Sequence, residues 1–309
     1  MDWEMVDWKA LARLRAGYLD GTAGVTDYWR SERDLASYDQ TFGQRIRWKW
    51  DYVLKELNGR GWAPPPGDVV DWGCGSGVAA RAFLDYFGPG SPTRFIFWDR
   101  SPLAMQFAAR KAREAFPEIS VWLEKPPEHA FGTLLISHVL TELTDNQLDE
   151  LLAFVGHATA AIWIEPGTYE ASRRLIAARE RLRDVFHVVS PCTHQAGCGM
   201  LTPENERHWC HHFAPSPPEV FMNGQWARFA KLAGVDLRSL PASFLVLDKH
   251  PQPVVGTVRV IGRPRVYKAH ALVLGCDSSG VREYRRTKRE QPEAFRRLKK
   301  GNFAPHFSV

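Results

Sequence analysis

Two hydrophobic periods alternate along residues 67 to about 190. Short apolar runs, typical of buried strands, are separated by stretches with an apolar residue at every third or fourth position, which predict helices. The predicted strands are Asp68–Trp72, Arg94–Trp98, Ile119–Leu123, Thr133–His138 and Ala160–Ile164, and the predicted helices lie near Val78–Tyr86, Leu103–Phe116, Asn146–Phe154 and Ser172–Val185. Such alternation predicts an α/β fold with a parallel, doubly wound sheet.

The segments on either side follow other patterns. Residues 1–66 show helical spacing and end in a glycine- and proline-rich break, which predicts a helical cap that can also act as a lid. Periodicity is lost from about residue 190 to 218, where Cys, His, Gly and Pro accumulate. Beyond it we expect a helix at Pro218–Ala233, β-rich segments at Phe244–Leu247, Val254–Ile261 and Val266–Leu274, and a basic helix within Val281–Lys300.

These patterns predict a helical cap at 1–66, a Rossmann-like domain at 67–189 and 218–248, a Cys/His-rich insert at 190–217 and a basic extension at 249–309. With 44% apolar and 24% charged residues in 309, the composition is that of a globular protein. No apolar run approaches the length of a membrane span, so no membrane partner is expected. The first nine residues mix acids with tryptophans, unlike a secretory signal or transit peptide, which predicts a cytoplasmic protein without a presequence.

The charge is unevenly distributed. Residues 249–309 contain 14 Lys and Arg against 4 Asp and Glu, whereas the rest of the chain contains 26 against 31. A basic tail on a mildly acidic body indicates a polyanionic partner, and a solvated basic helix explains the same charge equally well.

The first chemical motif runs from Asp71 through Gly73, Gly75 and Gly77, after a short β-branched run. Glycine at every second position lets a ligand approach the main chain, and the following helix N-terminus presents its N–H groups. The spacing differs from the dinucleotide fingerprint, in which the last glycine stands three places after the second. It resembles motif I of the class I S-adenosylmethionine-dependent methyltransferases. In that reading Asp99, at the end of the second strand, receives the ribose hydroxyls.

The fourth strand ends in Ser137-His138-Val139-Leu140-Thr141-Glu142-Leu143. In a methyltransferase, side chains at this place meet the methyl group and its acceptor, so Ser137 and His138 are predicted cofactor contacts. His138 or Glu142 could act as a base, although a packing or hydrogen-bonding role is slightly favoured for the histidine. The chain has no Asn/Asp-Pro-Pro-aromatic motif here, which weakens the case for an enzyme. The catalytic residues are otherwise unknown.

Four cysteines form the second candidate site. Cys192, Cys198 and Cys210 lie in the region without periodicity, and Cys276 follows later. Because the expected compartment is reducing and the total of five is odd, these residues favour a metal over a disulfide framework. Thiolates gathered from irregular loops can hold a [4Fe–4S] cluster. Buried free thiols remain an alternative, and so does zinc, with help from His194, His208 or His211.

Taken together with Glu165-Pro166-Gly167-Thr168 and Trp209-Cys210-His211, these motifs resemble the methyltransferase-like assembly factors of the small ribosomal subunit, which occur in mitochondria and have bacterial relatives. The resemblance covers roughly residues 30–300. It implies a class I methyltransferase fold with S-adenosylmethionine. It also implies a [4Fe–4S] site held by Cys192, Cys198, Cys210 and Cys276, whereas Cys74 is not a ligand. The implied partners are the RNA and proteins of the small subunit, and we expect a bacterial member that is monomeric off the ribosome.

Three functions follow. The first is an S-adenosylmethionine-binding ribosome-assembly factor whose basic residues contact RNA phosphates, namely Arg282, Arg285, Arg286, Lys288, Arg289, Arg296, Arg297, Lys299 and Lys300. The second is an active rRNA methyltransferase with the same surface. The third is a small-molecule methyltransferase with a zinc-stabilised insert, for which the basic C-terminal region would have no purpose.

Overall fold

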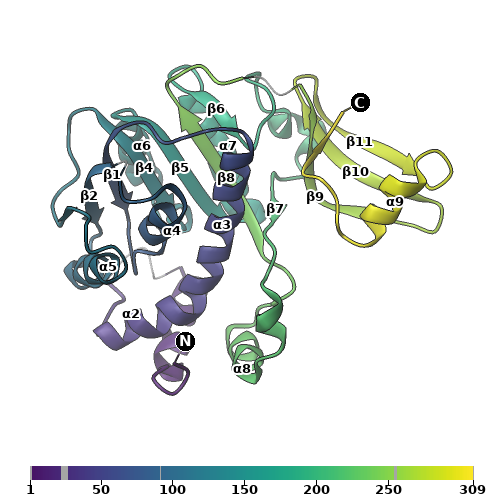
Figure 1. The fold of residues 1–309 in the computed structure, drawn as a ribbon. Helices are drawn as coiled ribbons and strands as arrows, with labels where there is room; N and C mark the ends of the chain where they lie inside the picture. The colour runs from purple at the N-terminus through teal and green to yellow at the C-terminus, as the bar shows by residue number, and fades with distance from the viewer. Residues whose placement is uncertain (1, 22–26, 91, 254–255, 309) are drawn as a thin grey trace. The chain divides into compact units, whose positions relative to one another are not determined.

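The computed structural model describes residues 2–21, 27–90, 92–253 and 256–308 (Figure 1). The chain forms two compact units. The first unit contains residues 1–165 and 214–240, and the second contains residues 166–213 and 241–309. The four segments predicted from the sequence divide the chain at other positions than these two units do. Their boundaries stay a prediction.

A parallel sheet forms the centre of the first unit. Its strands are β1 (Gly67–Trp72), β2 (Pro92–Trp98), β3 (Val121–Trp122), β4 (Phe131–Ser137) and β5 (Ala158–Pro166), in the order β3-β2-β1-β4-β5. All four pairings between these neighbours are parallel. Strand β4 carries almost only buried residues, and the second half of β1 is buried from Val69 to Asp71, as expected for a sheet covered on both faces. The connecting helices are α4 (Val78–Phe87), α5 (Pro102–Ala115) and α6 (Asp145–Val155).

The reversal of strand order beside β1 is the place where open α/β sheets bind ligands, at the carboxyl ends of the strands. Both the glycine loop after β1 and Ser137 at the end of β4 lie at this edge. The predicted class I methyltransferase-like α/β fold is therefore confirmed.

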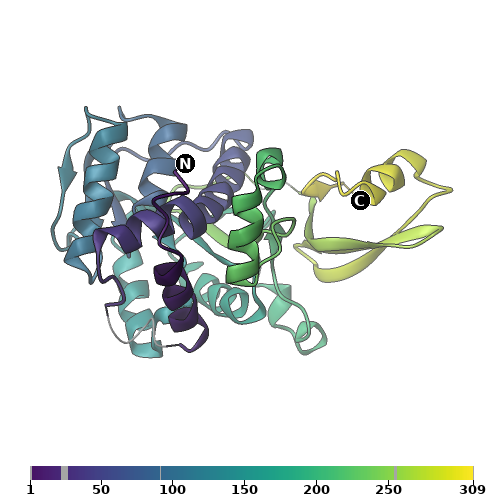
Figure 2. The same cartoon turned by 90° about the horizontal axis from the view of Figure 1, so that it is seen from below.

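The N-terminal helices pack onto the first unit. They are α1 (Trp8–Leu19), α2 (Glu32–Tyr38) and α3 (Gln44–Gly59), with a π-helical turn at Asp39–Gly43 between the last two. Helix α1 contacts α2 and also α8 (Gly224–Ala233), which lies beside the N-terminal helices in Figure 2. A cluster that includes Leu11, Trp48, Trp226 and Phe229 closes this part of the core.

The second unit is built on antiparallel pairing. Strand β8 (Pro241–Asp248) pairs with β6 (His187–Ser190) and β7 (His212–Phe213), and α7 (Tyr169–Leu182) packs on β8. A four-stranded sheet has the order β11-β10-β9-β12. Its strands are β9 (Val258–Val266), β10 (His270–Asp277), β11 (Gly280–Thr287) and β12 (His306–Phe307), with α9 (Pro292–Lys299) beside them (Figure 1).

The predicted basic helix over Val281–Lys300 is wrong in its first half. A turn at Gly280, whose φ is 116°, reverses the chain, and Val281 to Thr287 then pair fully with β10. Arginine and lysine favour helices intrinsically, but pairing with a neighbouring strand overrides this preference. Only Pro292–Lys299 is helical.

Several other predicted helices and strands begin or end at different residues in the structure. The predicted helix Pro218–Ala233 is split, because a 3₁₀ turn at Pro218–Phe221 precedes Asn223, which caps the α-helix. The predicted strand Val266–Leu274 is interrupted by a turn in which Tyr267 N donates to His270 O at 2.8 Å. In the predicted strand Val254–Ile261, residues 254 and 255 lie outside the described residues, and β9 begins at Val258. Helix α2 and strand β6 were not predicted.

Candidate cofactor pocket and candidate metal centre

The loop after β1 carries three glycines in the left-handed conformation. The φ angles of Gly73, Gly75 and Gly77 are 67°, 50° and 74°, a region that other residues rarely adopt. A Cβ atom would lie 2.9 Å from Val139 Cγ1 at Gly73 and 2.8 Å from Ala108 Cβ at Gly77, but would meet no atom within 4 Å at Gly75. The first and third glycines are thus also required by packing, whereas Gly75 leaves open space beside the loop.

The buried side chain of Asp71 links the end of β1 to the segment after the glycine loop. Its side chain is fully buried, and its Oδ2 accepts a hydrogen bond from Ala80 N at 3.2 Å. Its Oδ1 has no hydrogen-bond partner within the described part of the chain. Burial raises the pKa of Asp71 to about 8, so a nearby positive charge would be needed to keep it ionised at neutral pH. Asp71 ties β1 to the start of α4 and retains an unused acceptor.

Asp99 joins the second strand to the glycine loop. Its Oδ2 accepts a hydrogen bond from Gly75 N at 2.9 Å, and its Oδ1 accepts one from Ser101 N at 2.9 Å. Burial raises the pKa of Asp99 above its usual value. Because each carboxylate oxygen can accept a second hydrogen bond, Asp99 can also receive O–H donors from a ligand.

His138, at the end of β4, has a φ of 57° and is the one non-glycine residue with positive φ in the described ranges. Its Nε2 lies 2.9 Å from Lys49 Nζ, and its Nδ1 lies 3.3 Å from Ser137 Oγ. Ser137 Oγ also accepts a hydrogen bond from Trp50 Nε1 at 3.0 Å. Burial, reinforced by Lys49, lowers the pKa of His138 well below its usual value. Both ring nitrogens are engaged within the chain, so a role as base, which stays a prediction, requires one contact to open.

Lys49 of α3 is a site residue that the sequence analysis missed. Its side chain is buried, and burial lowers its pKa to about 7, while Glu165 acts in the opposite direction. Glu165 in turn accepts hydrogen bonds at Oε1 from Val139 N at 3.0 Å and from Trp163 Nε1 at 2.7 Å. No motif marks Lys49, because only tertiary packing brings its ammonium to His138, 89 positions away.

Some of these residues line a cavity of about 530 Å³ in the first unit, whereas Asp71, Gly77, Lys49 and Glu165 lie behind its wall. Cavities of roughly 300–1,000 Å³ commonly hold small ligands. Glu142 also lines this cavity, and burial raises its pKa to about 8 against the opposing effect of Arg100. Gly73, Gly75, Asp99, Ser137 and His138 are in the lining, together with the aromatic side chains of Tyr18, Tyr28, Trp29, Tyr38, Trp72 and Trp98.

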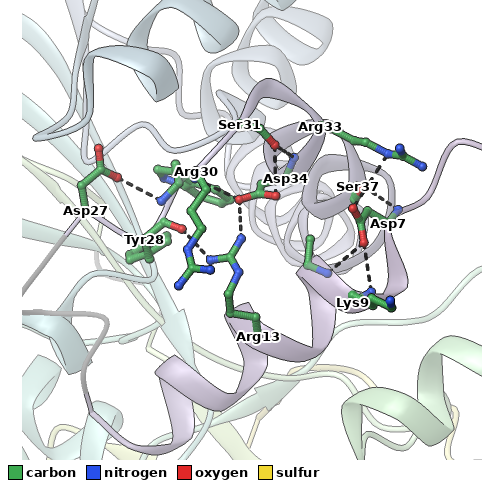
Figure 3. A network of polar contacts seen from close by, with 12 residues as sticks. Asp7, Lys9, Arg13, Asp27, Tyr28, Arg30, Ser31, Arg33, Asp34 and Ser37 are labelled. Carbon is green, nitrogen blue, oxygen red and sulfur yellow. Dashed lines mark hydrogen bonds and ion pairs between the residues drawn. The ribbon is translucent and has the colours of Figure 1, made fainter.

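The segment before α2, which carries Tyr28 and Trp29 into the cavity wall, is fastened by Asp34 (Figure 3). Asp34 is buried, forms an ion pair with Arg13 of α1 and accepts a hydrogen bond from Arg30 N at 2.9 Å. Arg13 also donates to Tyr28 O at 2.9 Å. The N-terminal helices therefore hold part of the cavity wall directly.

The substitution Asp34→Asn is expected to loosen this wall. Removing one charge from a mostly buried ion pair costs about 2 kcal/mol, so the amides of residues 27–31 should exchange hydrogen about 10- to 30-fold faster. Asp85→Asn, which breaks a more exposed ion pair with Arg47, is the matched control and should leave these amides unchanged. Equal exchange rates in Asp34→Asn and the wild type would contradict this role.

Three of the predicted metal ligands, Cys192, Cys198 and Cys210, line a small cavity of the second unit. Cys276 packs in the same apolar cluster as Cys198 and Cys210. All four are reduced cysteines outside any disulfide, as is Cys74 in the glycine loop of the first unit. Within the described ranges, no group of three or more His, Cys, Asp or Glu side chains has the arrangement to hold a metal ion. The four predicted thiols are thus in one region, without the geometry of a metal site.

Two buried arginines flank these thiols. Burial lowers the pKa of Arg179, but Cys192, Cys198 and Glu180 together raise it above its usual value. Arg259 lies 3.3 Å from His212 Nδ1, and His212 Nε2 lies 3.7 Å from Cys210 Sγ. Buried cations are costly unless anions balance them.

Glu180 forms an ion pair with Arg179. Burial raises the pKa of Cys198 to about 11, so an unbound thiol there carries no charge at neutral pH, whereas metal-bound thiolates would place negative charge beside these arginines. The chemistry of the donor set is therefore that of a thiolate–metal group, but the four side chains are not arranged as ligands of one ion in this structure. The cavity of about 30 Å³ would accommodate one ion, and a four-iron cluster would need the loops to stand farther apart.

The nine predicted RNA-binding residues all lie in the second unit, distributed over β11, the following loop and the end of α9. Arg282 forms an ion pair with Asp277, and the guanidinium of Arg286 lies 4.3 Å from the ring centre of Phe307. The second unit contains 20 Lys and Arg against 10 Asp and Glu. A positive surface is therefore present, on a sheet and a short helix together.

A family model described as "Mitochondrial small ribosomal subunit Rsm22" matches residues 51–307. The chain belongs to the Rsm22 family. The matched range includes the glycine loop, Asp99, the four cysteines and the basic residues of the second unit. The family resemblance inferred from the motifs is confirmed. No curated protein sequence matches this Rsm22-family chain significantly.

Solved structures of methyltransferases are similar to this Rsm22-family chain. The magnesium protoporphyrin IX methyltransferase ChlM from Synechocystis PCC 6803, solved with bound SAM, has 12% identity and a TM-score of 0.43, covering 79% of this chain and 98% of that chain. The plantazolicin methyltransferase BpumL, in complex with SAH, has 12% identity and a TM-score of 0.42, with 78% and 98% covered. Among the described residues, no helix has the length and apolar character needed to cross a membrane.

Proposed function

We propose that this chain is an S-adenosylmethionine-binding, metal-containing protein that acts on the RNA of the small ribosomal subunit. The observation that carries the proposal is the family match, which names the mitochondrial small ribosomal subunit and spans both candidate sites. The predicted bacterial cytoplasm and a monomeric state off the ribosome are parts of this proposal. Ribosomal proteins of the small subunit are further proposed partners.

The cavity of the first unit is the proposed S-adenosylmethionine site. Asp99 would accept the ribose hydroxyls on its free lone pairs, and the open space at Gly75 would admit the ligand beside the main chain. Asp71, Gly73 and Gly77 hold the loop in shape, while Ser137 and His138 form the wall at the end of β4. The acidic groups Asp99 and Glu142 favour the positive sulfonium group of the ligand.

Affinity for S-adenosylmethionine is expected to rise with pH. Burial raises the pKa of Asp71 and Glu142 to about 8, so both are largely protonated at neutral pH without a ligand. A cationic ligand favours the ionised carboxylates, so binding releases protons. The affinity should therefore increase at least about 10-fold from about pH 6 to about pH 8.5 and then level off.

Titration calorimetry at the two pH values, in buffers of different ionisation enthalpy, measures both the affinity and the protons released. S-Adenosylhomocysteine, which lacks the sulfonium charge, is the matched ligand and should show a smaller increase. Equal S-adenosylmethionine affinities at both pH values would contradict the electrostatic role of these carboxyl groups.

Cys192, Cys198, Cys210 and Cys276 are the proposed ligands of the metal centre. Four thiolates suit a [4Fe–4S] cluster, which is the occupant that the family resemblance implies, and zinc is the alternative. Either group would join the loop between β6 and β7 to strand β10. A chain purified without oxygen should contain iron and sulfide in equal amounts, and a colourless chain with one zinc per molecule would exclude the cluster.

The basic side chains of β11, the following loop and α9 are proposed to contact RNA phosphates. Such contacts give affinity that falls steeply with salt and depends little on sequence. Deleting the gene is expected to reduce the amount of mature small subunit while all methyl groups of its rRNA are retained. Normal amounts of mature subunit in the deletion strain would contradict the proposal.

A second candidate function is methyl transfer to the rRNA itself. The observation that favours it is the raised pKa of Glu142, to about 8, in the wall of the cofactor cavity, since a carboxyl group tuned in this way suits proton transfer near neutral pH. Mapping the methyl groups of small-subunit rRNA with and without the gene separates the two candidates. One missing methyl group, restored by the wild type but not by Glu142→Gln, would support the enzyme.

A further inference from the structure

The extended segment from Trp209 to Phe213 has two chemically different sides. Its odd-numbered residues, Trp209, His211 and Phe213, are aromatic rings that contact one another. Its even-numbered residues, Cys210 and His212, contact each other through Sγ and Nε2. Alternation of this kind is the normal geometry of an extended strand. One side of the segment therefore belongs to the candidate metal centre, and the other side forms a separate aromatic row.

The aromatic row is continuous and ordered. The ring centres of Trp209 and His211 are 4.6 Å apart with an interplanar angle of 19°, and those of His211 and Phe213 are 5.4 Å apart. Tyr169 at the start of α7 extends the row, with its ring centre 5.8 Å from that of Trp209. The Tyr169 side chain is 44% exposed, while the other three rings are half-buried.

The backbone holds these rings in place. Trp209 Nε1 donates to Gly167 O at 3.0 Å, and Gly262 N donates to His211 O at 2.8 Å. A Cβ atom at Gly262 would lie 2.9 Å from His211 Cε1, so the close approach of β9 requires glycine there. The Cys210 carbonyl oxygen accepts from Ser172 Oγ at 2.6 Å. The row is therefore preorganised, which lowers the entropic cost of binding a flat ligand.

An arginine side chain lies near each end of the aromatic row. The Arg263 guanidinium lies 4.1 Å from the Phe213 ring centre, and that of Arg173 lies 5.9 Å from the Tyr169 ring centre. Arg207 is exposed and its Nε lies 3.2 Å from His208 Nε2. Proteins commonly bind single-stranded nucleic acid with aromatic rings on which the bases stack and with flanking arginines that contact the phosphates. A protein partner would also find apolar area here, but it would not use the arginines so directly.

We propose that the row Tyr169–Trp209–His211–Phe213 is a stacking site for unpaired bases of single-stranded RNA. This inference rests on the proposed function, because it takes the RNA partner as given and assigns it a second contact surface. The basic residues of β11 and α9 hold phosphates, whereas this row holds base faces. Because Cys210 and Trp209 are neighbours in the segment that leads into β7, filling the metal centre would also fix the row.

The test uses the full chain purified without oxygen and a fluorescent oligouridylate of about 12 nucleotides, with anisotropy measured over a range of salt concentrations. Trp209→Ala is expected to weaken binding about 10-fold, because one lost base stack costs about 1–3 kcal/mol. The slope of log K against log salt should stay unchanged, since no phosphate contact is removed. Lys299→Ala, by comparison, should lower that slope by about 1.

Two further variants control the experiment. Tyr169→Ala removes the exposed end of the row and should also weaken binding at unchanged slope, so the inference stays testable if Trp209→Ala loses metal or stability. Trp122→Ala removes a tryptophan with the same 44% exposure from the first unit and should bind as the wild type does. Metal content per chain and the unfolding temperature are measured for every variant.

If Trp209→Ala and Tyr169→Ala both bind the oligouridylate with wild-type affinity, the inference of a stacking site is wrong. The proposed function would then rest on the phosphate contacts alone. Weaker binding with a reduced salt slope would also overturn it. So would unchanged RNA affinity combined with weaker binding to purified small-subunit proteins, which would make the row a protein surface. If the wild type itself binds neither the oligonucleotide nor small-subunit rRNA, the proposed function is wrong, and the stacking site that depends on it is wrong as well.

Discussion

Replacing Cys276 by serine is expected to remove the metal and to destabilise the whole second unit. Cys276 is 8% exposed on β10 and packs with Ile261, Met200 and two other cysteines. A metal bound by four thiolates would link β10 to the loop between β6 and β7. Metal binding in small domains contributes about 10 kcal/mol to folding, so a drop of several kcal/mol in the free energy of unfolding is expected.

Metal analysis and chemical denaturation of the purified variant measure this effect. Cys74→Ser is the matched control, because Cys74 is equally buried, at 6% exposure, but belongs to the glycine loop of the first unit. It should retain the metal in full. Equal metal content and equal stability in Cys276→Ser and the wild type would contradict the assignment of Cys276 as a ligand.

Replacing Asp99 by asparagine is expected to weaken S-adenosylmethionine binding about 100-fold. The carboxylate receives Gly75 N and Ser101 N at 2.9 Å each and would receive the ribose hydroxyls on its remaining lone pairs. Hydrogen bonds to a charged acceptor contribute about 1.5–3 kcal/mol, and the amide group can accept through only one of its two atoms. The loss of about 2.7 kcal/mol corresponds to two orders of magnitude in affinity.

Titration calorimetry of Asp99→Asn measures this loss directly. Glu118→Gln, which removes an exposed acid after α5, is the matched control for net charge and should bind normally. Amide hydrogen exchange of the glycine loop shows whether the variant keeps its fold. Unchanged affinity in Asp99→Asn would refute the ribose contact and leave the glycine loop without its proposed ligand.

The parallel sheet of the first unit could be predicted from the sequence because its signals are local. A β-branched run, an acid and alternating glycines stand within nine positions at Val69–Gly77, and Asp99 follows the next strand. The carboxyl ends of parallel strands meet at one edge of a sheet, which is where such sheets bind ligands. The hydrogen bond from Gly75 N to Asp99 Oδ2 joins the two loops at that edge.

Residues that act through tertiary packing could not be predicted in this way. Lys49 is one lysine in a helical pattern, and nothing local indicates its contact with His138. Arg259 belongs to a strand whose alternation predicts an ordinary β-residue, yet it is buried beside His212. Both contacts depend on elements that lie far apart in the chain.

In the basic segment Val281–Thr287 a local signal was present, but it predicted the wrong secondary structure. Arginine, lysine and glutamate favour helices intrinsically, so Val281–Thr287 was expected to be helical. The hairpin turn at Gly280 and the ladder with β10 make it an edge strand, where charged side chains are well tolerated. Its cations therefore lie on a sheet, and any RNA-binding surface there has the spacing of a strand rather than that of a helix.

The central claim is that this chain acts on the RNA of the small ribosomal subunit. Ultraviolet crosslinking of the full chain to RNA in living cells, followed by sequencing of the attached RNA, tests it most directly. We expect crosslinks concentrated in a few sites of small-subunit rRNA, and fewer of them when the basic residues of β11 and α9 are replaced. Crosslinks spread over small- and large-subunit rRNA in proportion to their abundance would contradict it.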